Sequence, residues 1–216
     1  GLVYKAEASI STLLSFKSEG FDFKNKDIVW LNLQEYIAYR LTGVMASEPS
    51  LTSRTGLYDQ SDLSMWQGAI DALGISKDFV PRELIAGSEW GKINSTYFKP
   101  EILGANVTIA GHDHAVGAMG CGATQPDQIF NSTGTSDAII RTVPGKLSDA
   151  QRLELTTMGV SAGRHVLKDL SGCIGGSRGG LVLRRALDLL GARKGERFLE
   201  IDNAWVPNLN FKEVID

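Results

Sequence analysis

The chemistry that this sequence can support starts at Asp113, which lies between His112 and His114. The apolar run 107–110 precedes them and predicts a short buried strand, and Gly111 then turns the chain. A carboxylate at a strand end is well placed to act as a general base that takes a proton from a substrate hydroxyl. Aspartate is also a favoured N-cap for the helix that the small residues after it predict. The local sequence alone favours the cap and leaves the base as a second interpretation.

The two flanking histidines raise the question of a metal. His112 and His114 would share one face of an extended chain. A zinc site needs at least three protein ligands, but His165 lies far along the sequence and the chain has no CxxC or HExxH motif. We therefore predict no metal ligands. A metal-dependent hydrolase built on His112, Asp113 and His114 is an alternative that bound metal would support.

Two glycine-containing segments are candidates for binding an anion. The turn Ser132-Thr133-Gly134-Thr135-Ser136 lies between apolar segments. In such a turn, backbone N–H groups and hydroxyls can point at phosphate oxygens, although a plain hairpin is the commoner meaning. The stretch 175–180 contains four glycines and precedes a predicted helix. It is a candidate anion site, because a helix N-terminus attracts anions; the alternative is a flexible connector. A GxxxxGK[ST] loop is absent, which excludes a P-loop NTPase.

The elements that must position these groups are predicted from apolar periodicity and from Gly and Pro breaks. The patterns predict helices over residues 8–18, over a mostly buried segment that starts at Asn25 or Asp27 and ends at 41, and over 62–73 and 181–190, with helical character again at 194–199. They predict strands or extended turns at 55–59, 90–93, 129–130, 138–143, 155–160 and 165–167, and a loop at 99–104. Helices dominate before residue 105 and strands after 125, which predicts a domain boundary at 124/125.

Composition and charge exclude several classes of protein. The 216 residues are 43% hydrophobic and 22% charged, which is typical of a globular domain. A net charge of −3 gives no electrostatic footprint for nucleic acid. No apolar run approaches the roughly 20 residues of a membrane span, and no signal peptide is evident. With Cys121 and Cys173 expected to be reduced, these features predict a cytoplasmic protein without a nucleic-acid or membrane partner.

The order of these features resembles the middle part of the FGGY family of carbohydrate kinases, within the actin-like/Hsp70-like ATPase superfamily. Five segments carry the resemblance. Residues 36–43 resemble the family's "yrLTG" helix end, 47–59 its "TDxSxASxTgLfD" segment with Glu48 in place of Asp, 109–113 its catalytic-aspartate segment, 131–136 its "GTS" hairpin, and Gly179-Gly180 its "GGallrW" turn with Arg184 in place of Trp.

The resemblance implies an α/β, actin-like ATPase (ribonuclease H-like) fold with parts of two domains: 1–124 from the sugar-binding domain and 125–216 from the nucleotide-binding domain. It implies ATP-dependent phosphorylation, with Mg²⁺, of a hydroxyl on a sugar, polyol or sugar acid. Asp113 would be the catalytic base and would contact substrate together with His112. Gly134, Thr135, Ser136 and Gly179 would bind the nucleotide.

The resemblance also leaves questions open. The family's first phosphate loop and its closing adenine segment are absent, so we expect an internal fragment of a longer kinase. A non-catalytic actin-like protein that binds sugar or ATP is the rival hypothesis, and Asp113 favours the enzyme because a sensor needs no base. Gluconate, xylulose, ribulose, fuculose, rhamnulose and glycerol kinases share these motifs, so the acceptor stays open, as does a homodimer.

Overall fold

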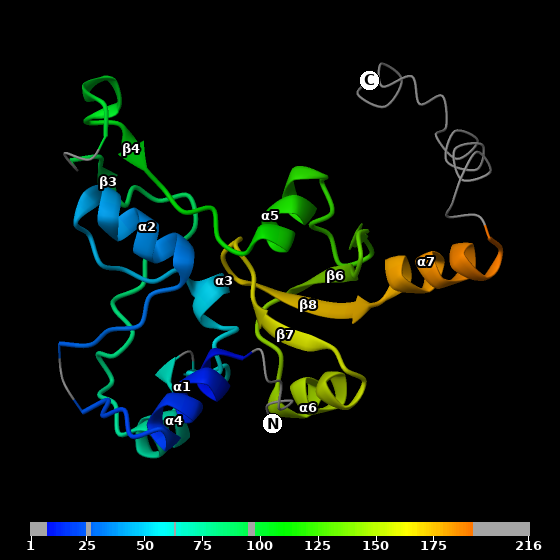
Figure 1. Cartoon of the computed structure of the whole chain (residues 1–216), viewed down its shortest axis with the longest axis horizontal. Coiled ribbons are helices and arrows are strands. Elements are labelled where there is room, and N and C mark those ends of the chain that lie inside the picture. The colour runs from blue at the N-terminus through cyan, green and yellow to red at the C-terminus, as the bar shows by residue number, and fades with distance from the viewer. Residues whose placement is uncertain (1–7, 25–26, 63, 95–97, 192–216) are drawn as a thin grey trace. The chain divides into compact units, whose positions relative to one another are not determined.

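The computed structural model describes residues 8–24, 27–62, 64–94 and 98–191 (Figure 1). The chain divides into two compact units, and each is described by itself. Unit 1 comprises the described residues up to 131 together with 139–175, and unit 2 comprises 132–138 and the described residues from 176 onward. The family-domain boundary expected at 124/125 stays a prediction. Among the described residues, no helix has the length and apolar character needed to cross a membrane.

Unit 1 is a mixture of short helices and small sheets. Its helices are α1 (Ser9–Ser18), α2 (Leu33–Thr42), α3 (Pro49–Thr52), α4 (Gln67–Leu73), α5 (Asp113–Gly120) and α6 (Asp149–Thr157), with a 3-10 turn η1 at Pro100–Ile102. Antiparallel pairs form between β1 (Tyr58–Asp59) and β2 (Ser64–Met65), and between β3 (Gly91–Lys92) and β4 (Asn106–Val107). Helix α7 (Gly179–Leu189) belongs to unit 2.

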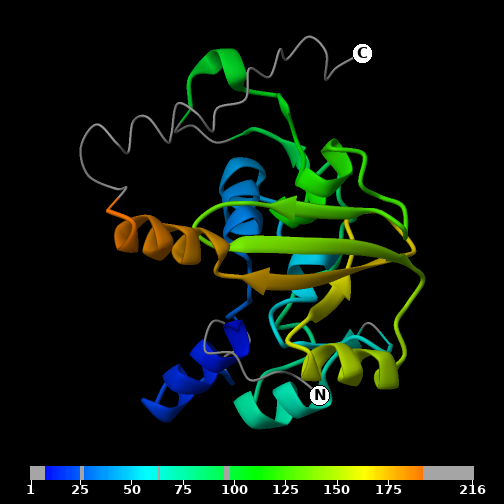
Figure 2. The ribbon, with the colours of Figure 1, turned by 90° about the vertical axis from the view of Figure 1, so that its right-hand side faces the viewer.

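The largest sheet has four strands, in the order β5 (Ile129–Ser132), β6 (Asp137–Pro144), β8 (Leu170–Ser177) and β7 (Ser161–Arg164). Figure 2 shows these strands side by side. Strands β7 and β8 pair antiparallel, and their register places Gly163 opposite Gly172. Two glycines facing each other leave this part of the sheet surface without side chains, and a neighbouring group can approach it closely.

Two hydrophobic clusters form the core of unit 1. The first joins α1 to α4 and is made of Leu13, Phe23, Leu57, Ala69, Leu73, Ile75, Phe79 and Val80. The second joins α2 and α3 to the segment after β4, through Ala38, Ala46, Leu51, Trp90 and Ile109. Ile109 is 6% exposed and lies two residues before Gly111. The second cluster therefore anchors the segment that leads to Asp113.

A buried acid joins the start of α2 to the start of α3. Glu35 is completely buried. Its Oε2 accepts hydrogen bonds from the backbone N and from Nδ2 of Asn32, at 2.6 and 3.0 Å, and its Oε1 accepts one from the backbone N of Glu48 at 2.7 Å. Burial raises the pKa of Glu35, and these hydrogen bonds act against that shift. The side chain thus satisfies backbone donors at two helix starts.

Replacing Glu35 by Ala is expected to lower the free energy of unfolding by about 3 kcal/mol, since a buried donor left without an acceptor costs about 1–3 kcal/mol. Urea denaturation measures the change. Glu154, an exposed acid on α6, is the matched control, and Glu154→Ala should change stability by less than about 0.5 kcal/mol. Equal losses in the two variants would contradict this role for Glu35.

Several predicted elements are confirmed. Helix α1 and strands β3, β5 and β6 form where the sequence predicts them, and α7 begins two residues earlier than predicted. Residues 58–59 form the strand expected within 55–59. The glycine-rich stretch 175–180 is not a flexible connector, because residues 175–177 end strand β8 and residues 179–180 begin α7. The helical character predicted at 194–199 lies outside the described residues.

Helix α2 differs from its prediction in both its start and its burial. It begins at Leu33, because Asn32 forms a capping box with Glu35. The preceding residues are extended, and the backbone N of Trp30 donates to the carbonyl of Phe79. The expectation of a mostly buried helix is wrong, since Leu33 and Ile37 are 71% and 50% exposed.

Other predictions after residue 60 are also corrected. The helix predicted over 62–73 starts only at Gln67, after strand β2. The strand predicted at 155–160 is wrong, because Ser148 and Gln151 form a capping box that starts α6. The strand predicted at 165–167 is a turn between β7 and β8, in which the backbone N of Leu167 donates to Nδ1 of His165. The strand predicted at 107–110 ends at Val107.

Candidate active site

Asp113 is the first residue of α5, and its side chain is 82% exposed. The N-cap position belongs to His112, whose side chain makes no capping hydrogen bond. Among the residues that the structure describes, Asp113 Oδ1 accepts only a local hydrogen bond, from the backbone N of His114 at 2.7 Å. The interpretation of Asp113 as the N-cap is therefore wrong. Its carboxylate lies in the first turn, where the helix dipole favours a negative charge, and it is open to solvent and available to accept a proton.

The turn before Asp113 is tightly enclosed within unit 1. Gly111 has a φ of +99°, which glycine adopts without strain. A Cβ on Gly111 would lie 2.5 Å from Cγ1 of Val166 and 2.7 Å from Oγ of Ser50. The backbone N of His112 donates to Ser50 Oγ at 2.9 Å. Contacts far along the sequence therefore fix the direction in which α5 leaves this turn.

His112 places an uncharged imidazole beside the carboxylate of Asp113. Burial, together with the charge of Arg54, lowers the pKa of His112 to about 4, and the charge of Asp113 only partly opposes this. Its Nδ1 lies 3.4 Å from Asp113 Oδ1 but makes no hydrogen bond within the described part of the chain. Because the imidazole is neutral at pH 7, this approach is not an ion pair. The rings of His112 and His114 lie 5.7 Å apart.

The imidazole of His112 is expected to stay neutral down to about pH 5 in the folded protein. A folded-state pKa of about 4 lies below the unfolded value of about 6.5. His112 therefore contributes stability that is present above pH 6.5 and is lost as the pH falls towards 4. Nitrogen-15 NMR of the imidazole across pH 4–8 measures the midpoint. A midpoint near that of the urea-unfolded chain would contradict the buried environment.

Arg54 is a residue of this site that the sequence reasoning did not single out. A Cβ on Gly163 would lie 3.9 Å from Arg54 Cζ, and one on Gly172 would lie 4.0 Å from its Nη2. The guanidinium therefore lies on the glycine pair of β7 and β8. Burial lowers the pKa of Arg54 to about 10, and the charge of Asp113 acts against that shift. Arg54 thus remains charged at pH 7 and acts electrostatically on the carboxylate.

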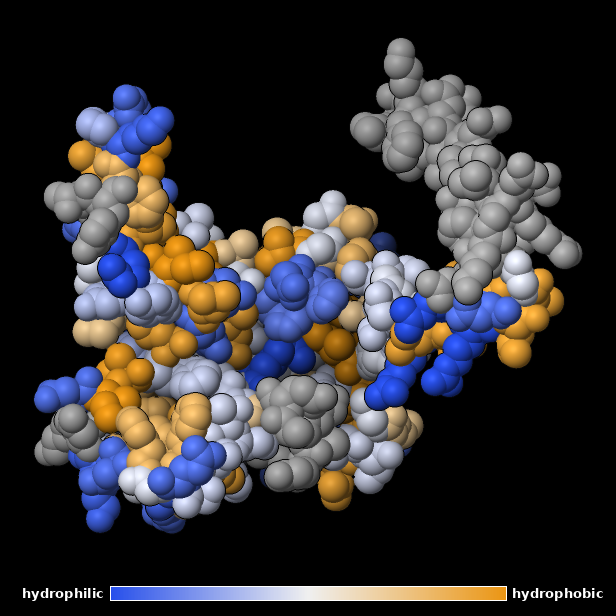
Figure 3. All heavy atoms as spheres, viewed as in Figure 1, coloured by the Kyte–Doolittle hydropathy of each residue, from blue (hydrophilic) through white to orange (hydrophobic). Residues whose placement is uncertain are grey.

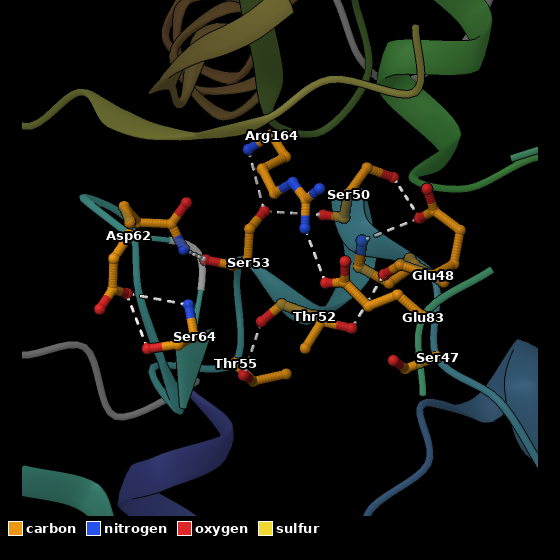
Figure 4. A network of polar contacts seen from close by, with 12 residues as sticks. Ser47, Glu48, Ser50, Thr52, Ser53, Thr55, Asp62, Ser64, Glu83 and Arg164 are labelled. Carbon is orange, nitrogen blue, oxygen red and sulfur yellow. Dashed lines mark hydrogen bonds and ion pairs between the residues drawn. The ribbon is translucent and has the colours of Figure 1, made fainter. Parts of the chain in front are cut away.

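Polar contacts join strand β7, which carries Gly163, to the end of α3. The backbone N of Arg164 in β7 donates to Oγ of Ser53, the C-cap of α3, at 3.1 Å. The guanidinium of Arg164 pairs with Glu83 Oε1 at 2.6 Å. Figure 4 shows these side chains around α3. In the sequence, Arg54 occupies the position that the family pattern "TDxSxASxTgLfD" leaves open, so the motif gave no signal for it. The available signal for Arg54 was its charge, in a segment after α3 whose other residues are uncharged.

The nucleotide-binding residues expected from the sequence lie together in unit 2. A Cβ on Gly180 would overlap the carbonyl oxygen of Gly134 and would lie 3.0 Å from the Cα of Thr135. The backbone of the 133–136 turn therefore packs directly on the first turn of α7. Arg178 is the N-cap of this helix and makes no side-chain capping bond. Uncapped backbone N–H groups at a helix start can bind an anion.

Asp137 adds a carboxylate to this part of unit 2. Its Oδ2 accepts a hydrogen bond from Ser177 Oγ at 2.8 Å, and a Cβ on Gly179 would overlap the carboxylate. Its Oδ1 is buried and has no hydrogen-bond partner among the residues that the structure describes. An unpartnered carboxylate oxygen suits a hard cation such as Mg²⁺, which commonly binds one or two carboxylates together with substrate phosphates.

The exposed surface of α7 is mixed in character. Val182, Leu183 and Leu189 are 65%, 55% and 89% exposed. The space-filling view in Figure 3 shows apolar and hydrophilic side chains together on this helix. Within the described ranges, no group of three or more His, Cys, Asp or Glu residues is arranged to hold a metal ion.

Comparison with known proteins assigns the chain to a family. The profile described as "FGGY family of carbohydrate kinases, N-terminal domain" matches residues 4–120, more than half of the chain. A glycerol kinase of Streptococcus pyogenes serotype M4 is 28% identical over 153 residues, which are 68% of this chain and 29% of the relative. A glycerol kinase of Enterococcus faecalis is 25% identical over 154 residues, which are 70% of this chain and 30% of the relative. The chain thus spans less than a third of these relatives.

Solved structures show the same fold. A ligand-bound xylulose kinase from Lactobacillus acidophilus matches 92% of this chain and 40% of its own, with a TM-score of 0.72 and 23% identity. A gluconate kinase from the same organism covers the same shares, with a TM-score of 0.65 and 20% identity. A glycerol kinase of Plasmodium falciparum with ADP has a TM-score of 0.64 and 14% identity.

These comparisons confirm the fold class that the motifs predicted, an α/β actin-like ATPase fold. The profile match ends at residue 120, shortly after the segment that carries Asp113. The chain belongs to the FGGY family of carbohydrate kinases.

Proposed function

We propose that the protein containing this chain transfers the γ-phosphoryl group of ATP to a hydroxyl of a sugar, polyol or sugar acid. The observation that carries the proposal is the exposed Asp113 carboxylate at the start of α5, on a turn fixed by buried contacts. Asp113 accepts the hydroxyl proton as the hydroxyl oxygen attacks the γ-phosphorus. The bond from the γ-phosphorus to the β–γ bridging oxygen breaks, and ADP leaves.

For the acceptor, we propose a site within unit 1 that contains Asp113 and His112. A neutral imidazole can hydrogen-bond a substrate hydroxyl without adding a charge, and because Nδ1 of His112 is buried, Nε2 is the nitrogen left for that contact. Arg54 adds a nearby positive charge that can offset negative charge developing during phosphoryl transfer. The similar kinases are named for glycerol, xylulose and gluconate, and we propose an acceptor of this polyhydroxylated class.

For the nucleotide, we propose the contact between the 133–136 turn and α7, which lies within unit 2. Gly134, Thr135 and Ser136 supply backbone N–H groups and hydroxyls to the phosphates of ATP, and Gly179 leaves room beside them. The direct backbone packing of Gly134 on Gly180 supports this role. Asp137 would hold Mg²⁺ through its unpartnered oxygen. When bound, the cation neutralises phosphate charge.

We further propose that the protein works in the cytoplasm, where ATP is made and used. Two thiols, Cys121 and Cys173, are free in the structure, which suits a reducing compartment. Size-exclusion chromatography with light scattering will show whether the protein is a homodimer.

ADP release by the full-length protein, measured over a panel of sugars, polyols and sugar acids, tests the proposed function. The expected result is release that depends on one acceptor or a small related group. ATP binding without acceptor-dependent release would support the non-catalytic alternative instead. Elemental analysis of the purified protein addresses the metal-dependent hydrolase, because that hypothesis requires a bound metal at His112, Asp113 and His114.

A further inference from the structure

We propose that Glu48 and Ser50 are positioning residues, which hold the turn before Asp113 and thereby aim its carboxylate; this inference rests on the proposed function of Asp113 as the base. Ser50 Oγ donates a hydrogen bond to Glu48 Oε2 at 2.5 Å and accepts one from the backbone N of His112 at 2.9 Å. Ser50 is 0% exposed and Glu48 is 1% exposed. Figure 4 shows the two side chains pointing toward one another at the start of α3.

The polarity of this contact fixes its direction. A backbone N–H can only donate, so Ser50 Oγ is the acceptor for His112, and the single hydroxyl proton of Ser50 is directed at Glu48 Oε2. The lone pairs of the hydroxyl oxygen are then left for the N–H of His112. That N–H belongs to the N-cap of α5, 62 residues away from Ser50. The first turn of the helix that carries Asp113 is therefore bonded to the first turn of α3.

Glu48 is itself held from two sides. Its Oε2 also accepts a bond from the backbone N of Leu51 at 3.0 Å, which caps α3. Its own backbone N donates to Glu35 Oε1 at 2.7 Å. The starts of α2, α3 and α5 are thus joined by one continuous series of hydrogen bonds, buried at its centre and partly buried at its two ends. Such a supporting series restricts how far the functional side chain can move.

The available space supports the same conclusion. A Cβ on Gly111 would come within 2.7 Å of Ser50 Oγ, within 3.1 Å of Glu48 Oε2 and within 2.5 Å of Val166 Cγ1. The turn therefore has no room to shift toward α3. Ser50 supplies the hydrogen bond at this closest approach, and its loss frees the turn without adding any bulk.

Ser50→Ala in the full-length protein tests the proposal, with Ser47→Ala as the matched control. Ser47 is also 0% exposed, and its Oγ donates to the carbonyl of Pro81 at 2.9 Å. Both variants remove one buried hydroxyl from the same segment. A misplacement of about 1 Å can lower the rate about 100-fold, so kcat of Ser50→Ala should fall between about 10-fold and 100-fold. The KM for ATP should stay within about twofold, as should both constants in Ser47→Ala.

Amide hydrogen exchange of the peptide that spans residues 109–119 gives a readout that does not depend on activity. The Ser50→Ala variant should exchange faster there, and Ser47→Ala should not. Equal kcat values in the two variants would overturn the positioning role, as would unchanged exchange in Ser50→Ala. A wild-type protein with no acceptor-dependent ADP release would instead overturn the proposed function, whatever the exchange result.

Discussion

Asp113→Asn is expected to lower kcat by a factor of about 10²–10⁴, the usual contribution of a general base. The amide has the same shape but cannot take the proton from the attacking hydroxyl. The Asp113 side chain is 82% exposed, and within the described part of the chain its carboxylate accepts only a local hydrogen bond, from the backbone N of His114. The substitution should therefore leave the fold and the binding of ATP nearly unchanged. Steady-state kinetics with saturating ATP and acceptor measure the loss.

Asp149→Asn is the matched control for this substitution. Asp149 is also the first residue of a helix, α6, and its side chain is 84% exposed. Both changes remove a negative charge from a helix N-terminus, which costs about 0.3–1 kcal/mol of stability. Only the change at Asp113 should affect kcat. A loss of less than tenfold in Asp113→Asn, or an equal loss in Asp149→Asn, would rule out the base.

Gly180→Ala is expected to weaken ATP binding, with KM for ATP rising about tenfold or more. A Cβ at this position overlaps the carbonyl oxygen of Gly134 and comes within 3.0 Å of the Cα of Thr135. These are backbone atoms, which cannot rotate away, so the 133–136 turn must move off α7. A displacement of about 1 Å in a positioned group can cost about 100-fold. Isothermal titration with ATP and steady-state kinetics both report the change.

The control for this variant is Gly120→Ala, in the last turn of α5. A Cβ on Gly120 would meet nothing within 4 Å. Alanine is favoured over glycine in a helix by about 1 kcal/mol, so this variant should be as stable as the wild type or more so, with unchanged KM. The same gain in helix propensity applies to Gly180→Ala, but there the steric overlap outweighs it, and the net effect on ATP binding is a loss. An unchanged affinity of Gly180→Ala for ATP would contradict the proposed phosphate site.

The sequence predicted those parts of the candidate site that are contiguous along the chain. Asp113 follows a buried apolar residue and a glycine turn, and the 133–136 turn lies between two strands, so local patterns suffice for both. The sequence also predicts helix α7 from a local pattern, because its apolar residues repeat at helical spacing. The positions of the strands around these turns follow from the same short-range periodicity.

The remainder depends on contacts between distant segments, which no local pattern records. Arg54 packs on Gly163 and Gly172 more than 100 residues later, and only the register of β7 and β8 creates that glycine pair. The bond from His112 to Ser50 spans 62 residues. These long-range contacts decide the electrostatics and the aim of the carboxylate, and the structure was needed to find them.

Two elements were predicted wrongly although the sequence contains the capping residues that start them, because neighbouring apolar residues suggested a different structure. The start of α2 is set by Asn32 and Glu35, but the preceding apolar residues extended the predicted helix backwards. The start of α6 is set by Ser148 and Gln151, while a β-like run after it predicted a strand. In both cases the capping box was the better guide, because it satisfies backbone N–H groups that otherwise lack partners.

Phosphorus-31 NMR of the complete reaction tests the central claim most directly. The full-length protein is incubated with ATP, Mg²⁺ and the acceptor that gives the highest ADP release. The account predicts a new phosphomonoester resonance that grows in step with ADP, because the γ-phosphoryl group moves to a substrate hydroxyl. ADP accompanied only by inorganic phosphate, or no acceptor-dependent product at all, would contradict it.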